Sequence, residues 1–363
     1  MKRYGNLYER IISIPNLELA DAKARKGKLR SYGVKQHDRN RAANIATLHK
    51  SLKEKTFKTS DYTVFKIYEP KERVIHRLPY YPDRIVHHAI MNVLEPIWLR
   101  TFTRNTYSCI KRRGIEGCAR QVERIIKRYE GSNLFCLKMD IKKFYPSIKP
   151  HISKDIIRRK IKDKDLLWLL DNIIDSSEGL PIGNYISQYL ANLILAYMMH
   201  YINEEMPEEI RRRLSLDKKP RLDSTEYADD ITLFSDSKEV LHEARRIINA
   251  YLLEELELQM KENWQVFPIA NNRFDEHGRA LDYVGYKFYR HQKLIRKSTK
   301  QNLCKAALKL YREKPDAEPW EVKHRMAPWL GWAKHSNSIH LLQTILKQEH
   351  YETCILRQRA SSL

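Results

Sequence analysis

The chain has 363 residues, of which 42% are apolar, and Gly and Pro are few, so it is globular rather than low-complexity, with room for two or three domains. It carries 67 Lys and Arg against 45 Asp and Glu, a formal net charge of +22. This excess favours a polyanionic partner, most simply nucleic acid, because Lys and Arg bind phosphates and release their counterions.

The cysteines and the longest apolar segment bear on the compartment. Five cysteines occur at wide spacings, without a Cys-x-x-Cys pair or zinc-like spacing, which predicts free, mostly buried thiols in a reduced, cytoplasmic protein. No apolar stretch follows Met1-Lys2-Arg3, so no signal peptide is expected there. The apolar run from Tyr189 to Met199 is too short to cross a bilayer and predicts a buried helix, so we expect no membrane contact.

The elements expected in the first half of the chain are mainly helices. Residues 1–60 have a helical and basic pattern. Tyr62 to Tyr68 alternates apolar and polar residues, as a strand does. Apolar residues then recur at helical spacing over 115–129, which predicts an amphipathic helix, and 134–141 has the pattern of a core strand.

The second half mixes helices with strands. Two helices are expected over 150–162 and 165–174, and a loop at 176–183 leads into an apolar helix that begins near Ser187. The further expected elements are a charged insertion over 204–219, a hairpin around Asp229, an amphipathic helix over 238–256, a strand over 281–288, and basic helices from Arg290 onward, interrupted at Pro315 and Pro319. We therefore expect an α+β core with a basic helical segment at each end.

Two adjacent carboxylates stand in the segment Tyr227-Ala228-Asp229-Asp230, which apolar, strand-forming residues flank on both sides. Such a pair at the tip of a hairpin suits hard divalent cations, although Asp-Asp alone is also a common turn sequence. Asp140 also leaves an apolar strand, and Tyr145 follows five residues later. The pattern fits two Mg²⁺ ions across one phosphoryl centre, and equally a strand that ends in Asp with Tyr145 in the core.

In their order and spacing these motifs resemble the palm of a reverse transcriptase. The motifs are Asp140 with Tyr145, the Gly-x-x-x-Ser turn that starts at Gly183, and the Tyr227-Ala228-Asp229-Asp230 box. The resemblance extends from about residue 68 into the C-terminal region, and it implies an α+β right-hand polymerase with fingers, a palm with an antiparallel sheet, and a helical thumb. The implied divisions are an N-terminal extension and fingers with the start of the palm (1–130), a palm with a finger insertion (131–289), and a helical thumb (290–363).

The resemblance also implies roles for individual residues. Lys71 and Arg73, on one face of a strand, would neutralise the triphosphate, and Tyr145 would lie under the sugar and exclude a 2′-hydroxyl. The implied catalytic residues are Asp140, Asp229 and Asp230, which with Ile141 would bind two Mg²⁺ ions. The implied nucleotide-binding residues are Lys71, Arg73, Tyr145, Ile182, Gly183 and Gln188, and the implied primer grip is Val284, Gly285 and Tyr286.

Four further residues leave two interpretations open. Arg84 would contact substrate or form an ion pair in the neighbourhood of Asp83. Lys261 is the nearest candidate for a lysine that protonates pyrophosphate, but we expect a solvated side chain. Trp329 and Trp332 lie in a stretch that resembles the thumb, and we favour packing between helices over a contact with nucleic acid.

The segment from Leu180 to Gln188 discriminates among reverse transcriptases. Ile182 stands where retroviral, retron and group II intron enzymes usually have Gln, and Gln188 stands where they usually have Pro. This version resembles the reverse transcriptases of diversity-generating retroelements. The implied function is error-prone copying of a template-repeat RNA, with misincorporation opposite adenines, for mutagenic retrohoming.

The implied partners are an RNA template, a DNA or RNA primer, dNTPs and a small basic helical accessory protein, in a bacterial or phage-encoded system. Three alternatives remain open. One is an antiphage-defence reverse transcriptase of the abortive-infection type, a type that can be template-independent, and another is a retron-like or group II-like reverse transcriptase. The third is a non-catalytic RNA-binding protein, against which the intact Asp140, Asp229 and Asp230 argue.

Overall fold

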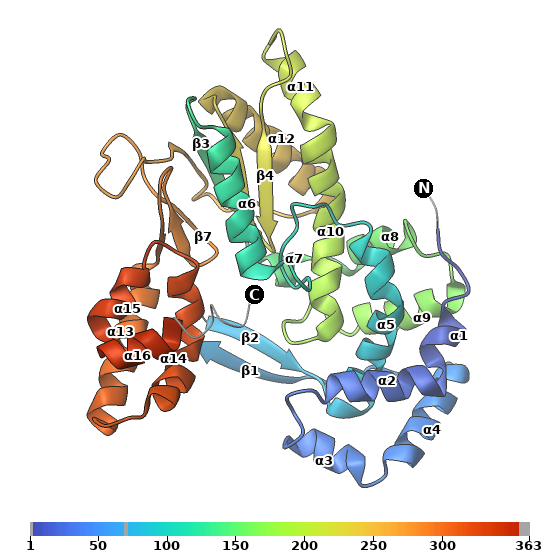
Figure 1. Cartoon of the computed structure of the whole chain (residues 1–363). Coiled ribbons are helices and arrows are strands. Elements are labelled where there is room, and N and C mark those ends of the chain that lie inside the picture. The colour runs from blue at the N-terminus through green and yellow to red at the C-terminus, as the bar shows by residue number, and fades with distance from the viewer. Residues whose placement is uncertain (1–2, 69–71, 356–363) are drawn as a thin grey trace, which may run out of the picture.

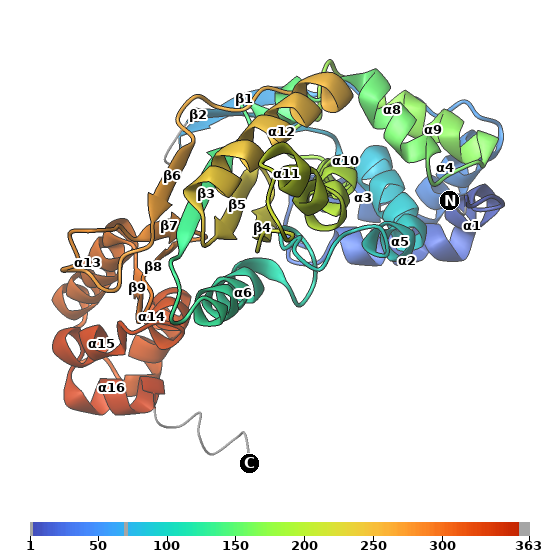
Figure 2. The ribbon, with the colours of Figure 1, turned by 90° about the horizontal axis from the view of Figure 1, so that it is seen from above.

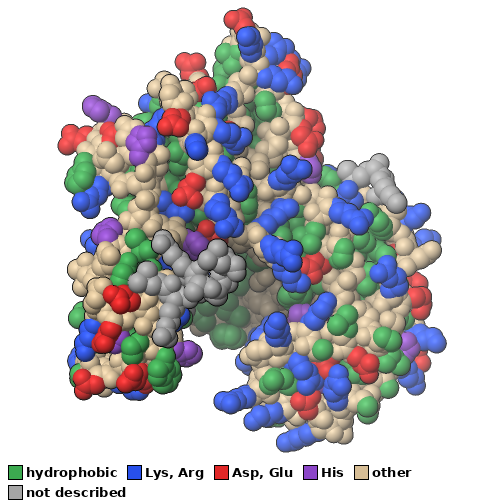
Figure 3. Space-filling model, viewed as in Figure 1, with side chains coloured by type: hydrophobic (Ala, Val, Ile, Leu, Met, Phe, Trp, Pro, Cys, Tyr) green, Lys and Arg blue, Asp and Glu red, His purple; other side chains and the backbone are tan. Residues whose placement is uncertain are grey.

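The computed structural model describes residues 3–68 and 72–355. Helices of the N-terminal third lie on one side of a central sheet, and a bundle of C-terminal helices lies on the other side (Figure 1). The space-filling view shows a hollow between these two flanks, with Lys and Arg side chains along its right-hand rim (Figure 3).

The N-terminal helices form one packed layer, as the pattern of the first 60 residues predicts. Leu17, Ala20 and Ala24 repeat along one face of α2 (Ile14–Ala24), which packs against α5 (Ile85–Leu99). The remaining members are α1 (Tyr8–Ile12), α3 (Tyr32–Asp38), α4 (Arg41–Lys53) and the short turn η1 (Tyr80–Arg84) that leads into α5.

A separate antiparallel hairpin, β1 (Thr63–Tyr68) and β2 (Glu72–Arg77), extends from this layer toward the C-terminal helices (Figure 1). None of the described side chains in its two strands is fully buried. The hairpin therefore projects from the core and does not form part of it.

The central sheet is antiparallel, with the strand order β4-β5-β3-β6. Its register places Asp140, the last residue of β3, opposite Asp230, the first residue of β5. The strands are β3 (Phe135–Asp140), β4 (Asp223–Tyr227), β5 (Asp230–Ser235) and β6 (Gln265–Pro268).

Helices cover both faces of this sheet. Alternate strand residues such as Leu137 and Leu233 join a core with α10 (Tyr185–Glu204) and α12 (Lys238–Leu256). Cys136 and Phe234 point to the other face and pack with α6 (Gly114–Arg128). Figure 2 shows α6 and α12 on opposite sides of the sheet. Because successive side chains of a strand point to opposite faces, the sheet contributes to one hydrophobic core on each face.

The apolar run at 189–199 lies within α10, as expected, and α12 has the expected bounds because Ser237 caps its N-terminus by accepting a hydrogen bond from the N–H of Val240. The charged insertion forms a helix of its own, α11 (Met206–Arg213). The other helices around the sheet are α7 (Phe144–Ser147), α8 (Pro150–Arg158) and α9 (Lys164–Ile174).

The C-terminal region differs from expectation at residues 281–288, whereas its helices are interrupted between Glu313 and Pro319, as expected. Residues 281–288 are a tight hairpin and not one strand, because Val284 (φ +41°) and Gly285 (φ +88°) turn the chain. Pro319 begins a helix, where its missing N–H is harmless. The elements are β7 (Leu281–Tyr283), β8 (Tyr286–Phe288), β9 (Lys293–Ile295), α13 (Lys297–Glu313), α14 (Pro319–Lys334), α15 (Ile339–Ile345) and α16 (Gln348–Ile355).

The five cysteines are free thiols, as expected. Three of them are buried, whereas Cys304 is half-buried and Cys109 is exposed. Within residues 3–68 and 72–355, no helix is both long and apolar enough to span a membrane.

Candidate active site

The strand ends bring three carboxylates together. Asp140 and Asp230 are cross-strand partners, and Asp229 precedes Asp230 in a turn that Ala228 makes with a φ of +57°. Burial, and then the charge of Asp140, raises the pKa of Asp229. Burial also raises the pKa of Asp230, to about 6, against the opposing effect of Lys138. Three acidic groups thus share a partly desolvated space in which their negative charges repel one another.

Two lysines partly neutralise this charge. The Nζ of Lys261 lies 2.5 Å from Oδ1 of Asp140, and the main-chain N–H of Lys261 donates to the carbonyl of Asp140 at 2.8 Å. The expectation of a solvated Lys261 is therefore wrong, because its side chain is only 33% exposed and ion-paired. The Nζ of Lys138 lies 3.4 Å from Oδ2 of Asp230.

The donor chemistry at these strand ends fits divalent cations. Carboxylate oxygens are the ligands that Mg²⁺ prefers, and Oδ1 of Asp230 is buried without a hydrogen-bond partner. In the described part of the chain, however, no three His, Cys, Asp or Glu side chains already form a ligand cage. Asp140 and Asp230 are instead ion-paired with Lys261 and Lys138. Ile141 buries its side chain, so only its main chain is available to a metal.

The loop before α10 connects this site to the β1–β2 hairpin. Half-buried Tyr145, whose pKa is raised by burial and by Asp229 among its neighbours, accepts a hydrogen bond at its carbonyl from the N–H of Leu180 (2.9 Å). The carbonyl of Ile182 then accepts from the N–H of His76 in β2 (2.8 Å). Gly183 follows with a φ of +124°, and a Cβ there would lie 2.5 Å from the carbonyl oxygen of His76. The loop thus places β2 close to the carboxylates.

The other expected nucleotide contacts are less constrained. Arg73 is exposed on β2, and Gln188 is exposed in the first turn of α10. Lys71 lies outside the described residues. Asp83 is buried and accepts a hydrogen bond from the N–H of Ser60, and no carboxylate among the described residues is ion-paired with Arg84. Among the described residues, Arg84 thus makes no ion pair with Asp83.

The expected primer grip is the β7–β8 turn. It lies against α14, one of the C-terminal, thumb-like helices α13 to α16. The ring of Tyr286 packs against Trp332 with the ring centroids 5.0 Å apart, and a Cβ on Gly285 would lie 2.4 Å from that indole. Both Trp329 and Trp332 are partly buried against the second core, as the packing interpretation predicts, but Trp332 packs on the β7–β8 turn and not only between helices. The hydroxyl of Tyr283 donates to the carbonyl of Asp230 (3.1 Å).

Two residues of this region escaped the motif-based reasoning. Lys138 lies two residues before Asp140, so period 2 already places both side chains on one face. Glu226 is fully buried beneath the carboxylate turn, accepts a hydrogen bond from the hydroxyl of Thr106 (2.9 Å), and has its pKa raised to about 8 by that burial. A charged residue inside a strand was the available signal.

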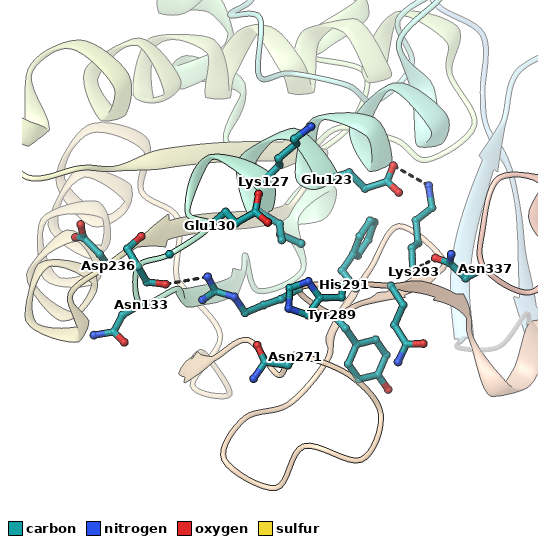
Figure 4. Close-up of a pocket in the computed structure, with 16 residues that line it drawn as sticks. Glu123, Lys127, Glu130, Asn133, Asp236, Asn271, Tyr289, His291, Lys293 and Asn337 are labelled. Carbon is teal, nitrogen blue, oxygen red and sulfur yellow. Dashed lines mark hydrogen bonds and ion pairs between the residues drawn. The ribbon is translucent and has the colours of Figure 1, made fainter.

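A cavity of about 1000 Å³ lies elsewhere, between the C-terminal end of α6 and the turn from β8 to β9. Figure 4 shows the ion pair of Lys293 with Glu123 (2.9 Å) on its wall, and Asn337 beside Lys293. The three carboxylates do not line this cavity. A cavity of about 460 Å³ does open at Asp140 and Asp230, and Lys138, Asp282 and Arg296 are on its walls.

Comparison with known proteins agrees with this geometry. The profile of the family described as reverse transcriptase (RNA-dependent DNA polymerase) matches residues 64–288. Protein YkfC of Escherichia coli (strain K12) is 25% identical over 250 residues, which are 60% of this chain and 66% of YkfC. The Retron Ec73 reverse transcriptase of Escherichia coli is 30% identical over 141 residues, 36% of this chain and 40% of that enzyme. The matches thus span 66% of one relative and less than half of the other.

Solved telomerase structures resemble the chain distantly. Apo telomerase from Candida Tropicalis aligns with a TM-score of 0.49 and 9% identity, over 79% of this chain and 57% of that one. Telomerase from Candida albicans with a fragment of telomeric RNA aligns with a TM-score of 0.45 and 12% identity, over 84% and 58%. The family profile covers more than half of the chain, and the α+β fold carries the three carboxylates on adjoining strand ends. The chain belongs to the reverse transcriptase family, and its fold is that of a right-hand polymerase.

Proposed function

We propose that this chain is an RNA-templated DNA polymerase that extends a DNA or RNA primer with dNTPs. The observation that carries the proposal is the register of β3 with β5, which brings Asp140, Asp229 and Asp230 to one end of the sheet. Two Mg²⁺ ions, held there by the three carboxylates, would activate the primer hydroxyl and stabilise the leaving pyrophosphate. The excess of Lys and Arg supports a nucleic-acid substrate.

The surrounding residues divide the remaining work. Arg73, with Lys71, neutralises the triphosphate. Tyr145 lies beneath the sugar and excludes ribonucleotides, and the turn at Val284–Gly285 holds the primer terminus. Main-chain contacts of the loop before α10 join these parts, because Leu180 bonds to Tyr145 and Ile182 bonds to His76 of β2.

Primer extension with the Asp229→Ala variant tests the site. On a primed RNA with Mg²⁺, we expect a loss of dNTP incorporation of at least about 10³-fold, since the removed carboxylate would help to hold the Mg²⁺ that stabilises negative charge in the transition state. Asp236→Ala is the matched control, because Asp236 is exposed and follows the opposite end of the same strand. Activity of Asp229→Ala at the level of that control would remove the site assignment.

Within this function, one named relative supports a retron-like enzyme. The Retron Ec73 reverse transcriptase matches this chain at 30% identity over 36% of its length. We therefore infer that this chain makes cDNA from a dedicated structured RNA. Sequencing of the cDNA formed with the RNA encoded beside the gene tests this inference, and we expect faithful copies of one defined segment.

A second candidate is error-prone synthesis for mutagenic retrohoming, with errors opposite adenines and a small basic accessory protein as partner. Ile182 and Gln188 favour it. The amide of a Gln at position 182 would hydrogen-bond near the incoming sugar or the template base, whereas Ile packs without donating. A loss of about 1–3 kcal/mol of discrimination changes error rates roughly 5- to 150-fold.

The Ile182→Gln variant tests that candidate. If Ile182 lowers fidelity, the substitution reduces misincorporation opposite template adenines in sequenced cDNA, within the range given above. Errors opposite the other three bases serve as the internal control. An unchanged error rate at adenines would exclude Ile182 as the cause, and a wild-type enzyme that is accurate at adenines would leave the retron-like candidate.

A further inference from the structure

We propose that Lys138 is a positioning residue that fixes the primer-grip hairpin, and with it the primer terminus, relative to the three carboxylates. The proposal rests on the polymerase function proposed above. Lys138 lies outside the recognised motifs. In this proposal it sets the distance between the primer end and the reacting phosphate.

Lys138 contacts three groups on two different sheets. It lies on β3, and its Nζ is 3.4 Å from Oδ2 of Asp230 on β5. The same Nζ donates to the main-chain carbonyl of Asp282 on β7 at 2.5 Å, and it lies 5.7 Å from the ring centroid of Tyr283. A carbonyl acceptor binds the ammonium whatever the side chain at position 282, so this contact fixes the backbone of the hairpin.

Tyr283 provides a second link between strands β7 and β5. Its side chain is fully buried, and its hydroxyl donates to the carbonyl of Asp230 at 3.1 Å. Strand β7 is thus joined to the first residue of β5 directly through Tyr283 and indirectly through Lys138. These contacts matter because β7, β8 and β9 form a separate sheet, with no strand ladder to β3 or β5.

The hairpin is held from its other side by the thumb-like helices. A Cβ on Gly285 would lie 2.4 Å from the indole of Trp332, so the turn already lies in contact with α14. Trp332 thus limits movement of the turn toward α14, and the contact of Lys138 with Asp282 limits movement away from the carboxylates. Loss of Lys138 removes one polar link between β7 and the carboxylates, while Tyr283 and the main-chain bonds of Arg279 with Pro268 and Ala270 (3.1 Å each) remain. A misplacement of about 1 Å lowers a rate by roughly 10²-fold.

A simpler role for Lys138 is neutralisation of Asp230. The two roles differ in what happens when Asp230 is already neutral. With Asp230→Asn, a residue that only neutralises charge has nothing left to do. A positioning residue still holds Asp282, so its removal still shifts the hairpin and the primer end.

The experiment uses the full chain and a primer–template whose 3′-terminal primer nucleotide is 2-aminopurine. The fluorescence of this base reports its stacking without metal and without catalysis. For Lys138→Met we expect a changed fluorescence of the bound primer end, kcat lowered about 10- to 100-fold, and the affinity for primer–template within about 3-fold, since backbone contacts elsewhere dominate binding. Lys138→Arg, which keeps the donor, is expected to recover at least half of the lost signal.

Lys154→Met is the matched control. Lys154 forms an ion pair with Asp175 at 2.6 Å. Its side chain is 24% exposed, against 28% for Lys138, but it lies on α8, away from the hairpin contacts. We expect wild-type kcat and fluorescence for this variant. The decisive comparison is Asp230→Asn with and without Lys138→Met: a further change in fluorescence supports positioning, and an identical signal overturns it.

Failure of this proposal is distinguishable from failure of the proposed function. A wild-type chain that extends no primer removes the polymerase function itself. A wild-type chain that extends primers, together with a Lys138→Met variant of equal kcat and equal fluorescence, removes only the role of Lys138. Should Lys138→Met fail to fold, Tyr283→Phe tests the same connection between β7 and β5, because it removes the hydroxyl that bonds to Asp230. We expect it to lower kcat about 3-fold and to change the fluorescence, and an unchanged signal would overturn the proposal.

Discussion

Strands β3 and β5 lie between helices on both faces, whereas no described side chain of the β1–β2 hairpin is fully buried. The first pair carries the three carboxylates, and the second carries Arg73. The β3–β5 pair is fixed by two hydrophobic cores. The hairpin is attached to the loop before α10 by the bond from His76 to Ile182.

We propose that the difference reflects two tasks. Carboxylates that share metal ions must keep a fixed geometry in a partly dry environment, and burial supplies both, at the cost of raised pKa values. A segment that closes on an incoming nucleotide must instead move, and it has few buried contacts to lose. Substitutions in the buried pair should therefore change stability or kcat, and substitutions in the hairpin should change nucleotide binding.

The largest expected effect concerns the stability of the buried sheet, at Glu226 on β4, the strand that pairs with β5. Burial raises the pKa of Glu226 to about 8, so the folded state keeps a proton that the unfolded state releases above about pH 4. This contribution to stability is complete below that pH and is lost as the pH rises to about 8. Glu226→Gln removes the titration, and we expect it to raise the free energy of unfolding by about 2–4 kcal/mol at pH 8 and by almost nothing at pH 4.

Urea unfolding of the metal-free protein at the two pH values measures this effect. Glu254→Gln is the control, because Glu254 is exposed on α12 and should give no pH-dependent gain. Equal gains at pH 4 and pH 8 would contradict a protonated Glu226 beneath the carboxylate turn.

A smaller effect is expected where the β1–β2 hairpin meets the loop before α10. Gly183→Ala adds a Cβ at 2.5 Å from the carbonyl of His76, at a φ of +124° that L-residues avoid. The hairpin would lose its attachment, and we expect kcat/KM for dNTPs to fall about 30-fold with little loss of global stability. Gly27→Ala shares the positive φ but has nothing within 4 Å, so it is expected to retain wild-type kinetics. Wild-type kinetics of Gly183→Ala would contradict the coupling.

The smallest expected effect separates the two faces of the hairpin. The register pairs Ile67 with Arg73 and Lys66 with Val74, so Arg73 and Lys66 lie on opposite faces. Arg73→Gln is expected to raise the KM for dNTPs about 10-fold with kcat within about 3-fold, because one charge on the phosphates is lost. Lys66→Gln should leave the KM for dNTPs unchanged. A raised KM for Lys66→Gln with an unchanged KM for Arg73→Gln would place the nucleotide on the other face of the hairpin.

Local patterns in the sequence were sufficient for most elements of the fold. The bounds of α12 follow from its apolar spacing and the capping Ser237, and the order of the motifs identifies the family. The split of 281–288 was missed because Val284 makes the turn in a conformation unusual for a β-branched residue.

The contacts within the site were less predictable. Lys261 lies 121 positions from Asp140, and the contact of Lys138 with Asp282 spans 144 positions. Such pairs depend on how β3, β6 and β7 come together in space, and no local pattern encodes that. The carboxylates could be found because their chemistry is local to two strand ends, whereas the ion pairs of Lys138 and Lys261 with them are identified only by the fold.

The most direct test of the central claim is single-nucleotide extension on a set of primed RNA templates with Mg²⁺. Each template presents one base, U, G or C, at the first copied position, and adenine is scored separately. We predict that the complementary dNTP is incorporated at least about 10²-fold more efficiently than the others on the first three templates, because selection follows the template base. Equal incorporation of all dNTPs, or incorporation without any template, would contradict RNA-templated synthesis by this chain.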